Sequence, residues 1–503
     1  MNKSKIKRRD FIKTLGLSAM GLSMGLKNVS ISNAKGSNYS KRPNLVYVFA
    51  DQLRYQSCGY AGDNCAITPN IDKLSSQGVN FCNAVSTMPV CTAHRASLFT
   101  GQYPSTHGVV VNELNIRPNH QCIGHCLTNA GYQTAYIGKW HLRELKNAPI
   151  PTGTARLGFD GYWAAYNFNH QCYKAKYWLN DNIQEPVYID GYEPDKQTDL
   201  AIKFINKATR KDQPFALFLS YGPPHPPMSD ENVPKEFSNR FSEKDFYLPP
   251  NWSDKPDPYM DRNKDQKSWI NNIKPNLPAR QKYYYAMTAS LDWNIGRLFT
   301  VLEKAGISGD TIFIFSSDHG EMFGAHGRIQ KLTFYEEAAR VPMLIRWTGK
   351  IPAGYISDAC FGTVDIMPTL LTMMNIKVPE SVDGVSLAHL AMGEKGPEPE
   401  AAFMQGMGHT FQWKDGFEWR AIRDKRYTYA IYRVDGSELL FDNTNDPYQM
   451  NNLVKDLKHK GILDRFRQML KKKMVKLNDT FEKCTWYRDH WMQGRTVLRG
   501  AKG

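Results

Sequence analysis

The sequence predicts an α/β fold in which helices sandwich a large, mostly parallel sheet, followed by a smaller C-terminal α+β subdomain with an antiparallel sheet. Two observations predict the large sheet: short apolar runs alternate with helical patterns, and the runs are nearly continuous, as in strands covered on both faces. A third observation predicts the subdomain, because after about residue 376 strand-like runs follow one another closely. We therefore assign residues 36–375 to the α/β domain and residues 376–503 to the subdomain.

Five apolar runs are the expected strands of the large sheet: 44–50, 134–138, 215–221, 311–317 and 342–347. Five segments with helical periodicity are the expected helices: 69–77 and, approximately, 195–208, 279–305, 365–374 and 455–476. The first helix should begin with Thr68 as its N-cap and Pro69 in its first turn. In the subdomain, WRAIRDKRYTYAIY and ELLFDN predict antiparallel strands that precede the last helix.

The composition suits a large globular protein with a basic surplus. The chain has 503 residues, of which 41% are hydrophobic, and a net charge of +15. Residues 1–35 hold eight of the 64 basic and one of the 49 acidic residues, so the remainder carries about +8. This surplus suits an anionic substrate, although a generic basic surface explains it equally well. The basic residues are scattered and form no nucleic-acid motif, so we expect no nucleic-acid partner.

Residues 1–35 resemble an export signal. The basic segment MNKSKIKRRDFIK precedes TLGLSAMGLSMGL, an apolar run too short for a permanent membrane anchor. Arg8 and Arg9, followed by Phe11 and Lys13, resemble a twin-arginine signal, and an ordinary secretory signal is the alternative. Either signal places the mature protein outside the cytoplasm, in the periplasm or secreted. No apolar run of 18 residues follows, so we expect no stable membrane insertion.

Reactive side chains follow four of the predicted strands at their carboxyl ends. In chain order they are Asp51 and Gln52, then Lys139 and His141, then His225, and finally Asp318 and His319. Ligands of open α/β sheets bind beyond the carboxyl ends of the strands, so we expect these side chains to converge on one pocket. Proline pairs on both sides of His225 should fix its position.

Cys91 opens the segment CTAHRASLFTG, which predicts the start of a helix. A side chain there lies near unpaired backbone N–H groups and the positive end of the helix dipole, where anions bind. Arg95, four residues on, returns to the same helix face. These features suit a reactive group, and a small buried cysteine is the alternative.

CTAHR matches the maturation signature Cys-x-Pro/Ala-x-Arg of the type I, formylglycine-dependent sulfatases, and ASLFTGQYPSTHGV continues it like the family's extended signature. Further segments resemble the family in the same order, from about residue 43 to residue 455: TPNIDKLSSQGVNF, GYQTAYIGKWH, SYGPPHPP, SSDHGEMFGAHG, YEEAARVPMLIRW, VDIMPTLL, VDGVSL and LLFDNTNDPYQMNNL. The chain thus resembles this family of the alkaline-phosphatase-like superfamily, and in particular exported bacterial glycan sulfatases. The resemblance implies the alkaline-phosphatase-like form of the α/β fold and makes residues 36–375 the catalytic domain.

The resemblance implies that a separate maturation enzyme oxidises Cys91 to formylglycine, which becomes the nucleophile when hydrated. Asp51, Gln52, Asp318 and His319 would hold one divalent cation together with the formylglycine oxygen, and such hard ligands favour Ca²⁺. The family's commonest pattern has Asp at position 52 and Asn at position 319. Fewer carboxylates should weaken Ca²⁺ binding, so Mg²⁺ stays open, and His319 could instead support the ligands without touching the metal.

The resemblance also assigns roles to the remaining site residues. Arg95 and Lys139 would stabilise the ionised nucleophile, and His141 would take a proton from its second hydroxyl. Lys331 and His225 would bind the sulfate and the bridging oxygen, with His225 as the acid for the departing alcohol. His326, in GAHGR, either touches substrate or satisfies a backbone carbonyl. The remaining aromatic and histidine side chains of these motifs are expected to pack or to be structural: Trp140, His94 and His107.

The predicted function is hydrolysis of carbohydrate sulfate esters. One alternative is a phosphate or phosphonate monoester hydrolase of the same superfamily, and another is a glycan-binding protein in which Cys91 stays a thiol. The sulfated carbohydrate as substrate rests on the export signal, on the resemblance, and on aromatic residues near the expected pocket: Trp163, Tyr166 and Tyr177. Specificity should come from the subdomain, from 145–195, and from 228–280, a predicted long surface insertion rich in Pro, Asp, Asn and Lys.

Overall fold

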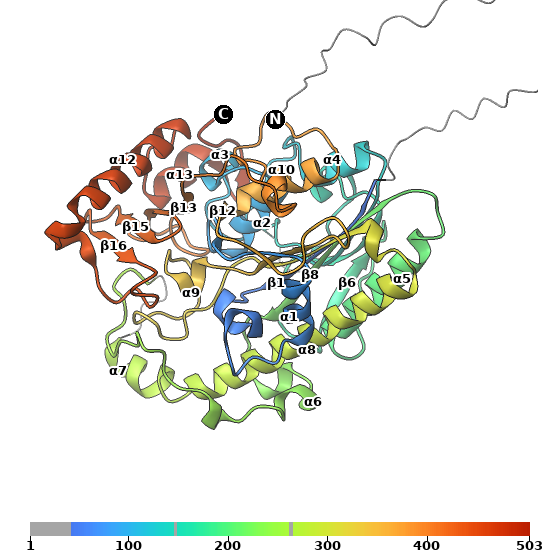
Figure 1. Cartoon of the computed structure of the whole chain (residues 1–503), viewed down its shortest axis with the longest axis horizontal. Helices are drawn as coiled ribbons and strands as arrows, with labels where there is room; N and C mark the ends of the chain where they lie inside the picture. Colours follow the sequence, from blue (N-terminus) through green and yellow to red (C-terminus); the bar gives the residue numbers. More distant parts are fainter. Residues whose placement is uncertain (1–41, 145–147, 261–264) are drawn as a thin grey trace, which may run out of the picture. The chain divides into compact units, whose positions relative to one another are not determined.

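A ten-stranded mixed sheet forms the centre of the structure, a computed structural model that describes residues 42–144, 148–260 and 265–503 (Figure 1). From edge to edge the strands are β11 (Tyr355–Ser357), β2 (Val79–Phe81), β10 (Met343–Arg346), β9 (Thr311–Ser317), β1 (Asn44–Asp51), β8 (Phe215–Pro224), β4 (Gln133–Lys139), β5 (Tyr162–Tyr166), β6 (Lys176–Leu179) and β7 (Val187–Tyr188). The five strands from β9 to β5 run parallel, whereas β10, β6 and β7 pair in the antiparallel sense. The prediction of a large, mostly parallel sheet is confirmed. The predicted export signal lies outside the described residues.

Four of the five predicted strands lie side by side as β9, β1, β8 and β4. Along β1, Tyr47 and Phe49 pack into the core on one face of the sheet, and Val46 and Val48 pack into the core on the other. Burial on both faces is why the run is apolar without interruption. The fifth predicted strand, 342–347, forms β10 and runs antiparallel to β9. The sequence did not predict β5.

Helices cover both faces of the sheet (Figure 1). On one face lie α1 (Pro69–Ser76), α5 (Glu193–Ala208) and α8 (Leu277–Lys304), and on the other α2 (Cys91–Thr100), α4 (Ile123–Asn129) and α10 (Thr363–Met373). The shorter elements of this domain are η1 (Tyr55–Ser57), η2 (Gly59–Ala61), β3 (Ala84–Val85), α3 (Pro104–His107), η3 (Gly153–Arg156), η7 (Ser308–Asp310), α9 (Glu336–Ala339) and β12 (Phe361–Gly362). Among the described residues, no helix has both the length and the apolar character that crossing a bilayer requires.

The start of α1 differs from the prediction. Thr68 stands at the N-cap position, but its hydroxyl accepts a hydrogen bond from the Gly59 amide at 2.8 Å instead of capping the helix. The amides of Asn70 and Ile71 donate instead to the carboxylate of Asp292 on α8, each at 2.8 Å. A carboxylate at the positive end of a helix is favourable. Thr68 therefore holds the predicted N-cap position, but the prediction that its side chain caps the helix is wrong, because Asp292 on the distant helix α8 supplies the acceptor.

The segment 228–280 crosses the surface and is anchored by a small core of its own. It contains the short elements η4 (Asp230–Asn232), α6 (Lys235–Ser238), η5 (Glu243–Asp245), α7 (Gln266–Ser268) and the π-helical turn η6 (Trp269–Ile273). Its buried side chains Val233, Phe237 and Phe246 pack against Met287 of α8. Apolar contacts with the long helix α8 thus stabilise this insertion, although its sequence shows no periodic hydrophobic pattern.

The C-terminal part contains the predicted antiparallel sheet. Its strands, in spatial and chain order, are β13 (Ala402–Gly406), β14 (Trp419–Arg423), β15 (Tyr427–Tyr432) and β16 (Glu438–Asp442). The predicted long helix is α12 (Lys460–Lys476), which packs on this sheet through Leu463 and Phe466. It begins five residues later than predicted, because 453–459 form 3-10 turns. The remaining elements are α11 (Ala388–Ala391), η8 (Leu453–Lys455), η9 (Leu457–His459), α13 (Cys484–Trp491), β17 (Met492–Gln493) and β18 (Thr496–Val497).

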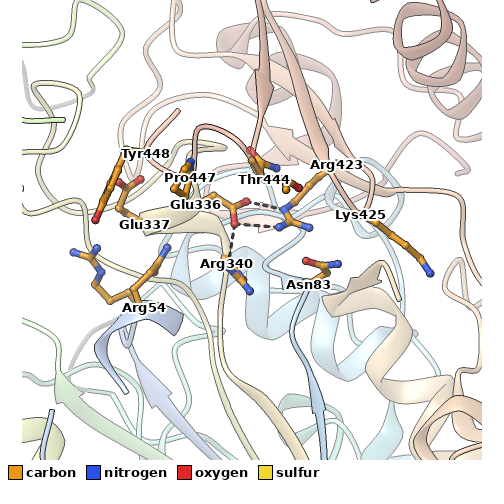
Figure 2. A pocket seen from close by; sticks show the side chains of 12 residues that line it. Arg54, Asn83, Glu336, Glu337, Arg340, Arg423, Lys425, Thr444, Pro447 and Tyr448 are labelled. Atoms are coloured by element: carbon orange, nitrogen blue, oxygen red, sulfur yellow. Dashed lines mark hydrogen bonds and ion pairs between the residues drawn. The ribbon is translucent and has the colours of Figure 1, made fainter. Parts of the chain in front are cut away.

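A bidentate ion pair joins the C-terminal sheet to α9 and lines a polar pocket of about 330 Å³ (Figure 2). Arg423, the last residue of β14, donates from Nε to Glu336 Oε1 at 2.6 Å and from Nη2 to Oε2 at 3.1 Å. Both side chains are buried, and Arg340 lies 3.6 Å from the same carboxylate. Burial alone would raise the pKa of Glu336, but the charge of Arg423 lowers it below its usual value.

Replacing Arg423 by alanine should lower the free energy of unfolding by roughly 3–5 kcal/mol, because Glu336 would keep a buried charge with less compensation. The matched control Arg426→Ala removes a half-exposed partner of Asp442, and the loss of stability in this variant should be clearly smaller than in Arg423→Ala, because solvent screens the Arg426 charge. Since folding lowers the pKa of Glu336, this stabilisation is present above pH 4.5 and is lost as the pH falls through the folded pKa. Urea unfolding of the wild type and both variants at about pH 7 and about pH 4 measures this contribution to the free energy of unfolding. Equal losses in the two variants would contradict the expectation.

Candidate active site

Four strand ends converge at one edge of the sheet, as the sequence predicted. Asp51 ends β1, Lys139 ends β4, and His225 and Asp318 follow β8 and β9. The Lys139 ammonium lies 2.5 Å from Asp51 Oδ2, and Arg95 Nη2 lies 3.5 Å from Asp318 Oδ2. The carboxyl ends of neighbouring parallel strands meet at this edge, which is where such sheets bind ligands.

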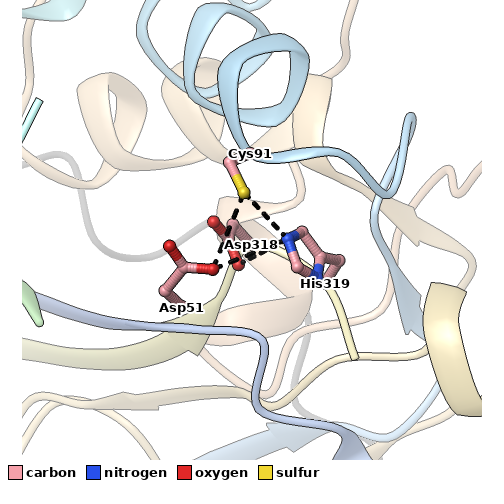
Figure 3. A group of neighbouring side chains, drawn as sticks. All are labelled: Asp51, Cys91, Asp318 and His319. Carbon is pink, nitrogen blue, oxygen red and sulfur yellow. Dashed lines mark hydrogen bonds and ion pairs between the residues drawn. The ribbon is translucent and has the colours of Figure 1, made fainter. Parts of the chain in front are cut away.

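Cys91 is the first residue of α2 and faces these strand ends (Figure 3). Its sulfur lies 3.7 Å from Asp51 Oδ1, 3.2 Å from His319 Nε2 and 3.0 Å from Lys331 Nζ. Every residue of α2 is buried, and Cys91 itself is 1% exposed. The helix start thus presents one thiol to a carboxylate, an imidazole and an ammonium group.

Asp51, Cys91, Asp318 and His319 form a group that could hold a metal ion, with all four ligand atoms within 4.8 Å of one another (Figure 3). The Nδ1 of His319 lies 3.1 Å from the Gly320 carbonyl, so Nδ1–H donates there and the lone pair of Nε2 faces the group. Burial lowers the pKa of His319 to about 4, so the ring is neutral, as a ligand must be. Burial and the charge of Asp51 raise the pKa of Asp318 to about 6. A divalent cation between the two carboxylates would relieve that repulsion, so the donor set fits one.

Gln52 lies beside this group in a left-handed backbone conformation, with φ of 74°. Its amide oxygen accepts from Lys331 Nζ at 3.0 Å, and its amide nitrogen donates to Glu321 at 2.5 Å. Glu321 thereby fixes which end of the amide faces the site. Sequence reasoning missed Glu321, although an acidic residue inside the apolar segment EMFGA was a usable signal.

Three buried cations surround the thiol: Arg95, Lys139 and Lys331. Arg95 donates from Nη1 to the Lys139 carbonyl at 2.6 Å and to Ser220 Oγ at 2.8 Å, so its guanidinium has a fixed place. Burial alone would lower the pKa of Lys331, but Cys91 and Asp51 raise it, so this ammonium stays charged. Cations held in place by hydrogen bonds can bind an anion with little rearrangement.

Three neutral imidazoles complete the site: His141, His170 and His225. Burial, followed by positively charged neighbours, lowers the pKa of each well below 6.5. The Nδ1 of His225 lies 2.8 Å from the Pro226 carbonyl, which leaves Nε2 to face the site as an acceptor. Within the described residues, neither ring nitrogen of His141 has a hydrogen-bond partner. Such a ring is free to exchange a proton with a ligand.

Sequence reasoning missed His170, whose ring stacks on His225 with centroids 3.6 Å apart and an interplanar angle of 9°. His170 follows β5, the strand that was not predicted, so its place beside the other strand ends could not be inferred. Its ring nitrogens, like those of His141, lack hydrogen-bond partners within the described residues.

A cavity of about 260 Å³ opens over Cys91. Side chains named above line it, namely His141, His225 and Lys331, and the remaining lining residues are Asn112, Glu113, Phe168, Gln330, Thr410 and Phe411. The last two belong to the C-terminal part, between β13 and β14. The walls are therefore assembled from segments far apart in the sequence.

Two of the three aromatic residues expected near the pocket, Trp163 and Tyr177, belong to the interior instead, whereas Tyr166 lines a second cavity beside the site. Trp163 packs against Trp140 at a centroid distance of 5.2 Å, and Tyr166 packs against Tyr177 at 5.3 Å. All four are buried, so Trp163, Tyr166 and Tyr177 do not offer a ring face to a sugar in the cavity over Cys91. The expectation that Trp140 is a packing residue is confirmed.

The other histidines of the sequence motifs are structural or lie elsewhere. His94 Nδ1 bonds to Ser86 Oγ at 3.0 Å, and His107 Nε2 bonds to Ser97 Oγ at 3.0 Å, as expected of structural residues. His326 stacks on Tyr335 at 3.8 Å and lines a different cavity, on the side of Asn251.

Comparison with known proteins agrees with this geometry. The family model described as "Sulfatase" matches residues 43–376, and the one described as "N-sulphoglucosamine sulphohydrolase, C-terminal" matches residues 324–478. The Ulvan-active sulfatase of Formosa agariphila is 36% identical over 456 residues, which cover 89% of this chain and 84% of that protein. The Endo-4-O-sulfatase of Bacteroides thetaiotaomicron is 30% identical over 485 residues, covering 86% and 91%. The crystal structure of the putative sulfatase yidJ from Bacteroides fragilis superposes with a TM-score of 0.77 at 29% identity, covering 93% of this chain and 99% of that one.

Proposed function

The chain belongs to the sulfatase family, and from this premise we propose that it hydrolyses sulfate esters of carbohydrates, with Cys91 as the precursor of its nucleophile. The observation that carries the proposal is the ring of buried cations and neutral imidazoles around Cys91, which suits a tetrahedral anion. The similar proteins from Formosa agariphila and Bacteroides thetaiotaomicron, named for ulvan and for a 4-O-sulfate, support a glycan as substrate.

Formylglycine at position 91, once hydrated, would supply an oxygen nucleophile, and a divalent cation would supply positive charge beside it. Asp51, Asp318 and His319, with the amide oxygen of Gln52, would hold that cation.

The other side chains would bind the substrate and move protons. Arg95 and Lys139 hold positive charge beside position 91, where negative charge develops. Lys331 lies 3.0 Å from the Cys91 sulfur and would bind the sulfate oxygens. His141 can accept a proton from the nucleophile, and His225 can deliver one to the departing alcohol.

We propose Ca²⁺ as the cation, because two carboxylates and an amide oxygen are hard ligands. Removal of bound metal with a chelator should then lower the midpoint of thermal unfolding, and excess Ca²⁺ should restore it. Ca²⁺ at 100 times its Kd would stabilise the fold by about 2.7 kcal/mol. Asp318→Asn should remove most of this shift, whereas Asp358→Asn, which alters an exposed partner of Lys425, should keep it. A midpoint that does not respond to Ca²⁺, or responds more to Mg²⁺ or Zn²⁺, would overturn the choice of metal.

The experiment that tests the function compares sulfate release with phosphate release from matched aryl esters, followed by a panel of sulfated sugars. The protein must carry matured Cys91, which mass analysis of the peptide around position 91 verifies. Faster phosphate release would favour a phosphate or phosphonate monoester hydrolase. An unmodified thiol in protein from its native host would favour a glycan-binding protein.

The proposal extends to maturation and location. A separate enzyme would oxidise Cys91, and the protein would act after export, in the periplasm or secreted. Support comes from the basic and apolar segments of residues 1–35, with Arg8 and Arg9 as a twin-arginine pair. Cell fractionation of the wild type beside an Arg8→Lys, Arg9→Lys variant tests this, because a twin-arginine signal should lose export in the variant.

A further inference from the structure

A second cavity, of about 190 Å³, adjoins the cavity over Cys91, and Phe168 lines both. We call it the adjoining cleft; its lining residues are Tyr166, Phe168, Asn169, Lys174, Lys176, Trp178 and Tyr188. It lies where β5, β6 and β7 form the edge of the large sheet, at the end of the sheet labelled by β6 in Figure 1. The Phe168 ring packs on His141 at 4.8 Å, so this one side chain separates the reacting groups from the cleft.

The adjoining cleft carries positive charge without a matching anion. Lys174 and Lys176 are its only charged lining residues, and no carboxylate lines it. Neither lysine forms an ion pair with any residue in the described part of the chain. A solvated lysine needs no partner, but two unpaired ammonium groups beside a cavity that opens next to an anion-binding site favour a second anion.

Aromatic rings accompany the two ammonium groups. Lys176 and Trp178 are two residues apart on β6, so their side chains point to the same face of the sheet. The Lys176 ammonium lies 5.9 Å from the centre of the Trp178 ring. Tyr188 of β7 stands directly opposite Lys176 in the antiparallel pair and is 73% exposed. Flat apolar rings next to a cation offer a sugar ring a stacking surface and offer its acidic group a counter-charge.

We propose that the adjoining cleft binds the sugar next to the one that loses its sulfate, and that Lys174 and Lys176 bind an anionic group, a sulfate or a carboxylate, on that neighbouring sugar. This inference rests on the proposed function. The protein would then select polyanionic oligosaccharides over singly sulfated monosaccharides, because only the former place charge in both cavities.

The test measures selectivity in the double variant K174A/K176A, with K471A/K472A, two exposed lysines of α12, as the control of equal charge. The probes are size-defined oligosaccharides of ulvan and of chondroitin sulfate, beside an aryl sulfate. The ratio of kcat/KM for the oligosaccharide to that for the aryl sulfate should fall about fivefold to tenfold in K174A/K176A, mainly through KM. High salt should reduce the difference. An unchanged ratio, or the same change in the control, would overturn the inference.

Oligosaccharide binding, measured in variants that also carry Cys91→Ala, tests this inference separately from the proposed function. If the wild type cleaves none of the probes, the choice of substrate has failed, whereas the cleft is still tested by binding of labelled oligosaccharides. The Kd should rise about fivefold to tenfold when K174A/K176A is added. An unchanged Kd, or no binding of any probe to Cys91→Ala, would overturn the adjoining cleft as a binding site.

Discussion

Replacing Cys91 by alanine should abolish sulfate release, with kcat reduced by at least about four orders of magnitude. The sulfur of Cys91 lies within 3.2 Å of both His319 and Lys331, and Cys91 is the one cysteine among the described residues that line the cavity. The substitution removes one atom from a buried site, so the fold should persist.

The control for this prediction is Cys126→Ala, which alters another buried cysteine, on α4 and outside the cavity. We expect the control to keep near wild-type kcat. Mass analysis of the wild type should find an aldehyde in place of the thiol at position 91. Activity in Cys91→Ala, or full activity in protein whose position 91 is an intact thiol, would contradict the role of this residue.

Replacing His225 by alanine should reduce kcat/KM for sugar sulfates by roughly 10²–10⁴, but the loss for a nitrophenyl sulfate should stay below about tenfold. A sugar alkoxide leaves only when it receives a proton, whereas a nitrophenolate leaves without one. The geometry supports His225 as the donor, because Pro226 holds Nδ1–H at 2.8 Å and leaves Nε2 directed at the cavity. In the ligand-free site burial and Lys331 keep the pKa of His225 well below 6.5, and the negative charge of a bound sulfate would raise it.

Lys331→Ala provides the contrast within the same site. In its proposed role Lys331 binds the sulfate group, which both substrates share, so its loss should slow both esters by a similar factor. The measurement is kcat/KM for each variant on both esters. If Lys331→Ala rather than His225→Ala shows the dependence on the leaving group, the two assignments must be exchanged.

Much of the fold was predictable because a strand that is buried on both faces has an uninterrupted apolar sequence. That pattern marked β1, β4, β8 and β9, and the reactive residues after them followed from the geometry of parallel sheets. The strand β5 reads YWAAY, a short run with two alanines, which are depleted in strands, so it was missed together with His170.

Other features depend on contacts that no local pattern contains. The acceptor at the start of α1 is Asp292, 221 residues from Ile71, and the partner of Gln52 is Glu321, 269 residues away. Which side of an aromatic ring faces a cavity is likewise decided by packing. Trp163 and Tyr177 therefore turned out to be interior residues, while Phe168 forms the wall.

The burial of Cys91 would set the order in which the proposed oxidation and folding can occur. With 1% of its surface exposed at the start of a fully buried helix, the thiol is out of reach of any enzyme that must enclose it. Oxidation of this residue would have to come before α2 takes its place, and a chain that folds first would be trapped as the thiol. The fraction of active molecules would then depend on the rate of oxidation relative to the rate of folding. It would be set during the first folding of each chain, and later exposure to the same oxidising enzyme would not change it.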